Sequence, residues 1–147
     1  MKKTTLFIII LLSALPPGCL DFGKDEETQT PTAAQVARCR SVMYLNPDLK
    51  IGPLGFKLRG SGIDDAIWFK FKAKASEVAE VFDTAVVDVS EFKQGFTMLS
   101  VKGLKWWDVK GKTFLGGEVS LPNVKFMKAG ITKTADGFLV YIMWHEV

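Results

Sequence analysis

Two cysteines and one histidine are the residues of this chain best suited to nucleophilic chemistry. A histidine can deprotonate a neighbouring thiol, so Cys39 and His145 form one candidate pair. No spacing rule brings them together, and Cys39 lies in an expected helix, where a cysteine is usually a small buried hydrophobe. A thiol-dependent or hydrolytic envelope enzyme is therefore the least favoured of three function classes.

Acidic residues give no catalytic or metal-binding pattern. Asp64 and Asp65 are adjacent, and adjacent side chains of a strand point to opposite faces, so we interpret the pair as part of a turn. A zinc site needs more His or Cys than this chain holds. Asp83, Asp88 and Glu91 lack the spacing and the central Gly of a calcium loop. The sequence predicts no metal and no cofactor.

Tryptophans are the residues most open to a binding role. Trp106 and Trp107 are adjacent, so in a strand one would face the core and the other the solvent. An exposed tryptophan among lysines can stack on a glycan ring or contact an envelope protein. Trp68, Trp106 and Trp107 are the candidate contact residues. The alternative is that both adjacent rings are packed, one in the core and one under a connecting loop.

The N-terminus has the organisation of an export signal. Two lysines precede an apolar run of ten residues, 6–15, which is followed by Pro16, Pro17, Gly18 and Cys19. Ten residues span about 15 Å as a helix, which is too short to cross a bilayer. We predict a signal peptide over residues 1–18 that is cleaved between Gly18 and Cys19.

This segment resembles the bacterial lipoprotein class, in which a cysteine directly after such a signal is lipidated. Gly18 and Cys19 match the class pattern, whereas Pro16 stands where Leu is usual. The resemblance implies a diacylglycerol on the Cys19 sulfur and an acyl group on its amine. It also implies an outer membrane location facing the periplasm, because Leu20 rather than Asp follows the cysteine.

Composition and charge suit one exported domain. The chain has 147 residues, 48% of them hydrophobic, and a formal charge of +3. Removal of Lys2 and Lys3 leaves 17 basic and 16 acidic side chains of the 19 and 16 in the whole chain. A near-neutral domain gives no footprint for nucleic acid. The polar residues 19–35 predict a flexible tether, and residues 36–147 one globular domain.

Local patterns predict the elements that position these residues. Thr32 can cap a helix through Val36 and Cys39 that ends at Asn46 and Pro47. Residues 66–73 alternate as a strand, and Asp136 and Gly137 predict a hairpin between residues 126–132 and 138–145. Further strands are expected at 54–59, 96–101 and 104–109, the last as a strand or tight bend, and a short helix at 77–82.

These elements predict an α+β domain with a mostly antiparallel sheet of about five or six strands, an N-terminal helix and one short inserted helix. The alternative is a small all-β barrel. The favoured function is a non-enzymatic binding or interaction module, anchored to the membrane through Cys19, with an unknown ligand. Alternatives are an immunity or surface-exclusion lipoprotein that blocks a toxin or receptor, and the enzyme above.

Overall fold

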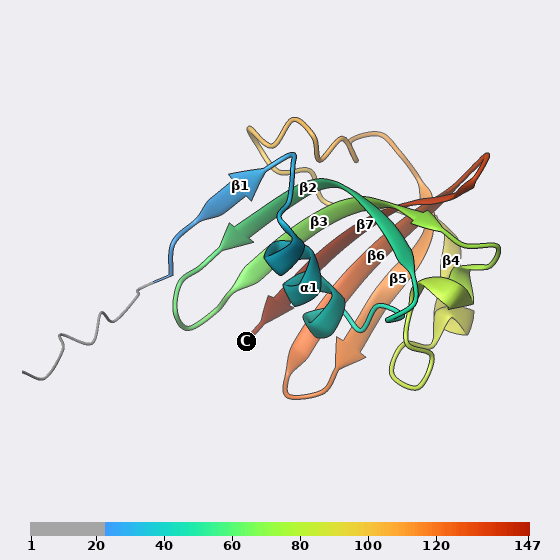
Figure 1. Ribbon diagram of the computed structural model, residues 1–147, viewed down its shortest axis with the longest axis horizontal. Helices are drawn as coiled ribbons and strands as arrows, with labels where there is room; N and C mark the ends of the chain where they lie inside the picture. Colours follow the sequence, from blue (N-terminus) through green and yellow to red (C-terminus); the bar gives the residue numbers. More distant parts are fainter. Residues whose placement is uncertain (1–22) are drawn as a thin grey trace, which may run out of the picture.

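A computed structural model describes residues 23–147 of the chain. Seven antiparallel strands form one sheet in the order β1-β2-β3-β7-β6-β5-β4 (Figure 1). The strands are β1 (Glu26–Thr28), β2 (Lys50–Arg59), β3 (Ala66–Lys74), β4 (Lys93–Phe96), β5 (Phe114–Leu121), β6 (Lys125–Thr134) and β7 (Gly137–Glu146). One α-helix, α1 (Ala33–Val42), and two short 3-10 helices, η1 (Val78–Val81) and η2 (Val89–Glu91), complete the described elements.

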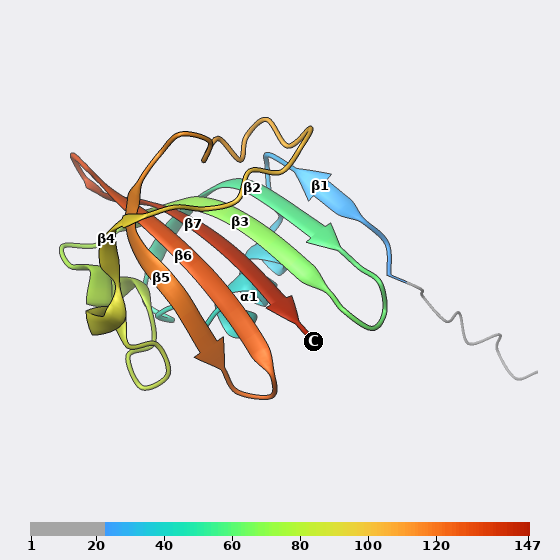
Figure 2. The ribbon, with the colours of Figure 1, turned by 180° about the vertical axis from the view of Figure 1, so that it is seen from behind.

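The sheet is open, because its edge strands β1 and β4 do not pair with each other in the part of the chain that the structure describes. After β3 the chain crosses to the far edge, forms β4, and returns through β5 and β6 to place β7 against β3 (Figure 2). The domain is thus mostly β with one α-helix, rather than α+β. The alternative of a barrel is wrong in its closure, although its mostly β character is right.

Helix α1 covers one face of the sheet, which we call the inner face. Its N-terminus is fixed by a capping box, in which Thr32 accepts a hydrogen bond from the Gln35 amide and Gln35 accepts one from the Thr32 amide. Cys39 and Met43 of this segment are fully buried. The predicted N-terminal helix is therefore present, and it begins at Ala33, inside the segment expected to be a tether.

The inner face alternates as the sequence predicted. On β3 the buried side chains are Ile67, Phe69, Phe71 and Ala73. On β7 they are Phe138, Val140, Ile142 and Trp144. These side chains join those of α1 in one apolar core. The predicted hairpin is also confirmed, since β6 pairs with β7 along its whole length up to Thr134 and Gly137.

The predicted strand at 96–101 is wrong. Of the two alternatives at 104–109 the tight bend is correct, since the Trp107 amide donates to the Leu104 carbonyl in a turn. Residues 97–113 form a long loop that lies across the opposite face of the sheet, the outer face (Figure 1). Its apolar side chains pack on Trp68 and Tyr141 and so form a second core. Gly103 and Gly111 turn the loop with φ values of 84° and 74°, which suit glycine. Apolar residues that seemed to mark strands are buried by this packing instead.

The short helix predicted at residues 77–82 is a single 3-10 turn, η1. The backbone at its end forms hydrogen bonds with the segment after α1: the Asn46 amide donates to the Val81 carbonyl, and the Asp83 amide donates to the Tyr44 carbonyl. Phe82 also forms an isolated bridge with Leu45. These bonds extend the chain after Val81, so an α-helix cannot propagate there.

The predicted tether is wrong in its second half. Residues 26–28 pair with residues 56–58 of β2 as an edge strand. Glu27 forms an ion pair with Lys57 at 3.4 Å, and Glu26 accepts a hydrogen bond from the Gln35 side chain. The polar side chains suggested disorder, but an edge strand can keep them in solvent while its backbone pairs. Residues 19–22 of the expected tether lie outside the described residues.

Candidate ligand pocket

A row of side chains crosses the outer face of the sheet. Lys57, Trp68, Met143 and Lys128 lie directly opposite one another on β2, β3, β7 and β6. Directly opposed residues of antiparallel strands share a face, so the four side chains project together. Two apolar side chains are thereby placed between two lysines.

The neighbouring row lies nearer the start of β3 and carries polar groups. Arg59 and His145 each lie opposite Ala66, and Phe126 lies opposite His145. The Arg59 guanidinium carbon is 5.9 Å from the centre of the Trp68 ring, a cation–π distance. The imidazole of His145 stacks on Phe126, and its buried Nδ1 has no hydrogen-bond partner in the described structure.

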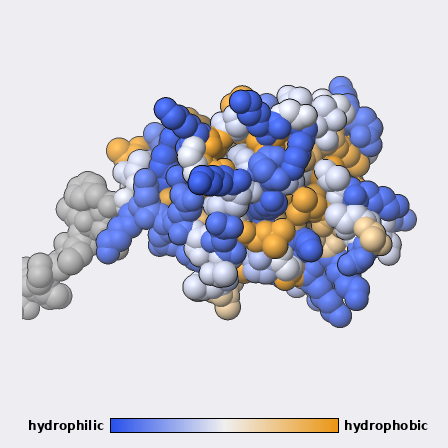
Figure 3. Space-filling view, turned by 90° about the horizontal axis from the view of Figure 1, so that it is seen from above, coloured by the Kyte–Doolittle hydropathy of each residue, from blue (hydrophilic) through white to orange (hydrophobic). Residues whose placement is uncertain are grey.

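The loop of residues 97–113 closes these rows into a pocket of about 570 Å³. This volume lies within the range of about 300–1,000 Å³ that small-molecule sites occupy. The loop is at the top of Figure 1, so Figure 3 views the molecule from the side of the loop. Patches of apolar surface lie there between hydrophilic side chains (Figure 3). The lining residues are Asp25, Lys57, Arg59, Trp68, Met98, Leu99, Ser100, Val101, Lys102, Trp107, Lys128, Met143 and His145.

Aromatic packing fixes the loop over the pocket. The Trp107 ring packs edge-on against Tyr141, with centroids 5.4 Å apart, and its indole N–H donates to the Leu99 carbonyl at 3.0 Å. Trp106 lies on the backbone of β2, where a Cβ atom at Gly55 would overlap its ring. The absence of a side chain at Gly55 is therefore required for the loop to reach the sheet.

A carboxylate ties the loop to the sheet by charge. Asp108 accepts hydrogen bonds from Lys70 at 2.6 Å and from the Tyr141 hydroxyl at 2.8 Å, and it pairs with Lys112 at 2.5 Å. Partial burial alone would raise the pKa of Asp108, but these three donors outweigh it and hold the pKa well below its usual range. Burial, and then the carboxylate, raise the pKa of Tyr141.

We expect Asp108→Asn to lower the free energy of unfolding by about 1 kcal/mol at pH 7, a small effect because water screens this half-exposed group. The ionised carboxylate stabilises the fold above the ordinary aspartate pKa of about 4, and that stability is lost as the pH falls below it. Urea-unfolding curves of the variant and the wild type should thus converge towards about pH 2. Curves equally far apart at both pH values would contradict the charge-based account.

The charge around the pocket is predominantly positive. Lys57 and Lys128 form ion pairs with Glu27 and Glu118, at 3.4 and 2.8 Å; these glutamates lie directly opposite them on β1 and β5, at the two outer ends of the same row. Two further cations of the lining, Arg59 and Lys102, form no ion pair within residues 23–147. The single carboxylate of the lining, Asp25, accepts a hydrogen bond from the Gly60 amide.

No family model, curated protein or solved structure matches this chain. The pocket's geometry is therefore the basis on which a function can be argued. It offers an apolar floor of indole and thioether groups beside guanidinium, ammonium and imidazole donors. This arrangement suits a molecule with an apolar body and an anionic group.

All three predicted contact residues lie on the outer face, but none is exposed. Trp68, Trp106 and Trp107 are 8%, 8% and 3% exposed. The alternative that both adjacent rings are packed is confirmed, and neither ring faces solvent, because both are on a loop that packs against the sheet. Trp68 and Trp107 line the pocket, whereas Trp106 packs beside it.

Sequence reasoning missed the other pocket residues. Met143 and His145 alternate along β7 with its four core residues, so their side chains are on the outer face of the sheet. Period-two alternation in residues 138–145 was a usable signal for their shared face. Nothing local indicated that Met98 or Lys128 would meet them there.

The candidate pair of Cys39 and His145 is separated by the sheet. Cys39 belongs to the inner core, whereas His145 lines the pocket on the outer face. Burial raises the pKa of the Cys39 thiol to about 12, so it is protonated at neutral pH. The expectation of a buried Cys39 is confirmed, and this pair cannot act as a thiolate and its base.

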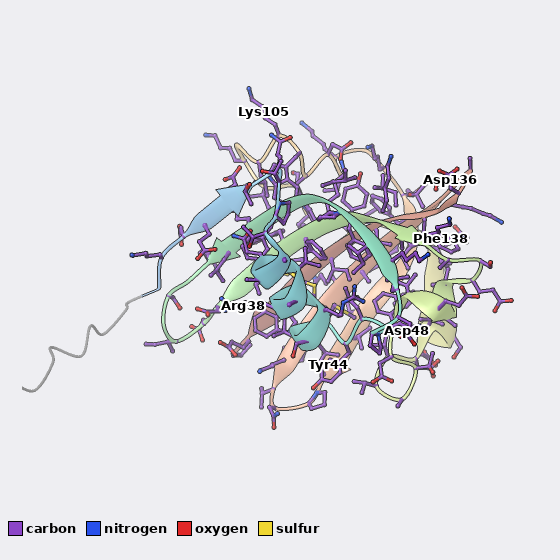
Figure 4. All side chains as sticks on the ribbon, in the orientation of Figure 1. Arg38, Tyr44, Asp48, Lys105, Asp136 and Phe138 are labelled. Atoms are coloured by element: carbon purple, nitrogen blue, oxygen red, sulfur yellow. The ribbon has the colours of Figure 1, made fainter. Side chains whose placement is uncertain are left out.

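The adjacent aspartates form a turn, as interpreted from the sequence. Asp65 accepts a hydrogen bond from the Ser61 amide and pairs with Arg38 of α1 at 3.3 Å; Figure 4 labels this arginine on the helix. Residues 23–147 contain no cluster of three His, Cys, Asp or Glu able to hold a metal. In the same range, no helix is long and apolar enough to cross a bilayer.

The predicted lipidation site lies outside the described residues. Gly18 and Cys19, the expected cleavage and acylation positions, precede Gly23, where the described chain begins. Lipidation at Cys19 therefore stays a prediction from the sequence.

Proposed function

We propose that this protein is a lipid-anchored protein of the cell envelope whose domain binds, without catalysis, an amphipathic molecule with an anionic group. The pocket under the loop of residues 97–113 is the observation that carries the proposal. Trp68 and Met143 provide an apolar floor, and Arg59 and Lys102 provide cations without ion-pair partners among the described residues.

Each part of the pocket has a distinct contribution to binding. Transfer of an alkyl chain from water to the apolar floor is favourable by about 0.8 kcal/mol per buried methylene. A guanidinium can donate two parallel hydrogen bonds to a carboxylate or phosphate, and the Arg59 guanidinium lies beside the Trp68 ring in the pocket lining. The unpartnered Nδ1 of His145 can serve as one more hydrogen-bonding group. We therefore expect the cationic side chains to give specificity for an anionic head group. Burial of the ligand's alkyl chain should give most of the affinity.

A set of three amphiphiles with one chain length tests the proposal. Dodecanoate, dodecanol and dodecyltrimethylammonium carry the same alkyl chain with negative, zero and positive head groups. Below the micelle concentrations of the two ionic compounds and the solubility limit of dodecanol, we expect affinity to fall in the order dodecanoate, dodecanol, dodecyltrimethylammonium. Trp68 and Trp107 line the pocket, so intrinsic tryptophan fluorescence reports the binding. Absence of saturable binding by all three compounds would refute the proposed function.

Arg59→Gln should weaken dodecanoate binding about tenfold, the effect of losing a charged hydrogen bond worth about 1.4 kcal/mol. Dodecanol affinity should not change, because it has no charge for Arg59 to meet. Lys105→Gln is the matched control: it also removes one positive charge, but from the loop of residues 97–113, where Lys105 points away from the domain (Figure 4). Equal weakening by both variants would show that only net charge matters.

A further inference from the structure

The point where the described chain enters the fold is fixed at one end of the sheet. Gly23 lies against Gly60, so closely that a Cβ atom at Gly23 would overlap the Gly60 backbone. Cys19 is only four residues before Gly23, and four residues reach at most about 14 Å. An acyl group on Cys19 therefore holds this end of the sheet next to the bilayer.

Three chain segments meet at this same end. The β2–β3 turn, the C-terminus and the β5–β6 turn lie along this end of the sheet, the β2–β3 turn nearest to the start of the described chain and the β5–β6 turn farthest from it (Figures 1 and 2). The Glu146 amide donates to the Asp65 carbonyl, and the Val147 amide donates to the Val124 carbonyl at 3.4 Å. These bonds join the two turns through the last strand into one surface.

This surface holds most of the exposed apolar side chains of the described domain. Five large hydrophobic residues are exposed, and four of them, Ile63, Val124, Phe126 and Val147, lie here. Ile63 and Val124 are at the tips of the turns and are 82% and 62% exposed. Val124 also has a φ of 56°, a conformation that valine disfavours and that Asn or Gly would adopt more easily. Turn chemistry alone does not account for a valine at this tip.

We propose that this end of the sheet is a membrane-contacting surface, with the Ile63 and Val124 side chains in the interfacial layer of the bilayer. The inference rests on the proposed anchor at Cys19, which fixes the distance. Apolar side chains at an interface add to the affinity of a lipid anchor. Arg59 and His145 lie in the strand row at this end, so these two lining residues are the part of the pocket closest to the head-group region, where amphipathic anions are concentrated.

Site-specific labelling of the acylated full-length protein tests this orientation. The native Cys39 is fully buried, so a polarity-sensitive thiol dye reacts selectively with an introduced cysteine. Ile63→Cys places the dye on the proposed surface, and Val124→Cys repeats the test on the second turn. Ala135→Cys is the control: Ala135 is exposed beside Asp136, at the opposite end of β7 (Figure 4). Ten residues of strand separate the ends by about 33 Å.

The three labelled proteins are reconstituted into phosphatidylethanolamine–phosphatidylglycerol vesicles that contain a spin-labelled lipid. We expect a blue-shifted emission and several-fold stronger quenching at positions 63 and 124 than at 135. Equal quenching at both ends, in protein that floats with the vesicles, would overturn the orientation and leave the anchor intact. Protein that does not float would remove the anchor, and the orientation with it, while the amphiphile titrations would still decide the pocket's function.

Discussion

Trp107→Ala should lower the free energy of unfolding by about 3–5 kcal/mol, the usual cost of truncating a buried aromatic side chain. Trp107 is 3% exposed, packs against Tyr141 and donates its indole hydrogen to Leu99. Its removal leaves a cavity between the loop and the sheet and an unpaired carbonyl at Leu99. Urea unfolding measures the loss, and dodecanoate titration should show that binding is lost as well, because Trp107 forms part of the pocket wall.

Lys105→Ala is the control within the same loop. Its side chain is exposed, and a surface substitution of this kind changes stability by less than about 0.5 kcal/mol. A small loss for Trp107→Ala, similar to that of Lys105→Ala, would mean that the loop is not packed on the sheet as described.

Gly55→Val should destabilise the protein by about 3 kcal/mol, through overpacking of the loop against β2. A Cβ atom at this position would overlap the six-membered ring of Trp106. The ring is rigid and buried, so the loop has to move outward. Limited proteolysis should then cleave within residues 97–113 at a protease concentration that leaves the wild type intact.

Gly52→Val is the matched control on the same strand. A Cβ atom at Gly52 would lie 3.6 Å from the Lys72 Cβ atom, an ordinary contact distance. Its effect should be small, and valine also favours a strand. In a double-mutant cycle, Gly55→Ala should cost much less in a Trp106→Ala background than alone, because the obstructing ring is gone. Additive losses would refute direct packing of Trp106 on Gly55.

Ligand binding should stabilise the loop of residues 97–113. Because the loop forms one wall of the pocket, a ligand that binds only the folded state stabilises it by about 2.7 kcal/mol at a concentration of 100 times Kd. Dodecanoate at 100 times Kd should therefore more than offset the loss of about 1 kcal/mol in Asp108→Asn, which loosens the loop without removing a pocket residue.

Elements with strong local signals were predictable from the sequence. Thr32 and Gln35 form a capping box, Asp136 and Gly137 mark a hairpin, and residues 66–73 alternate. Each signal depends on neighbouring residues alone. The short 3-10 turn shows the opposite case, since its backbone is determined by pairing with residues 44–46, far away in the chain.

Distant contacts decided the features that local patterns missed. Strand β1 is polar and exists because β2 offers a pairing edge. The loop of residues 97–113 looked like strands because its apolar residues have to be buried, and only the tertiary fold shows that they cover the outer face.

The candidate pocket depends on the strand register. Lys57, Trp68, Met143 and Lys128 become neighbours through three separate strand pairings. The tryptophans were correctly identified as notable residues, and Trp68 and Trp107 do line the pocket. Neither is an exposed contact, because Trp107 belongs to the loop that packs on the sheet and Trp68 lies beneath that loop.

A crystal structure with 12-bromododecanoate would show where the pocket holds each end of an amphipathic anion. The bromine atom marks the end of the alkyl chain by anomalous scattering, and the carboxylate marks the other end. The account predicts a bromine peak beside Trp68 and Met143 under the loop, with the carboxylate within hydrogen-bond distance of Arg59. A pocket that stays without ligand at concentrations that saturate the fluorescence titration would contradict it.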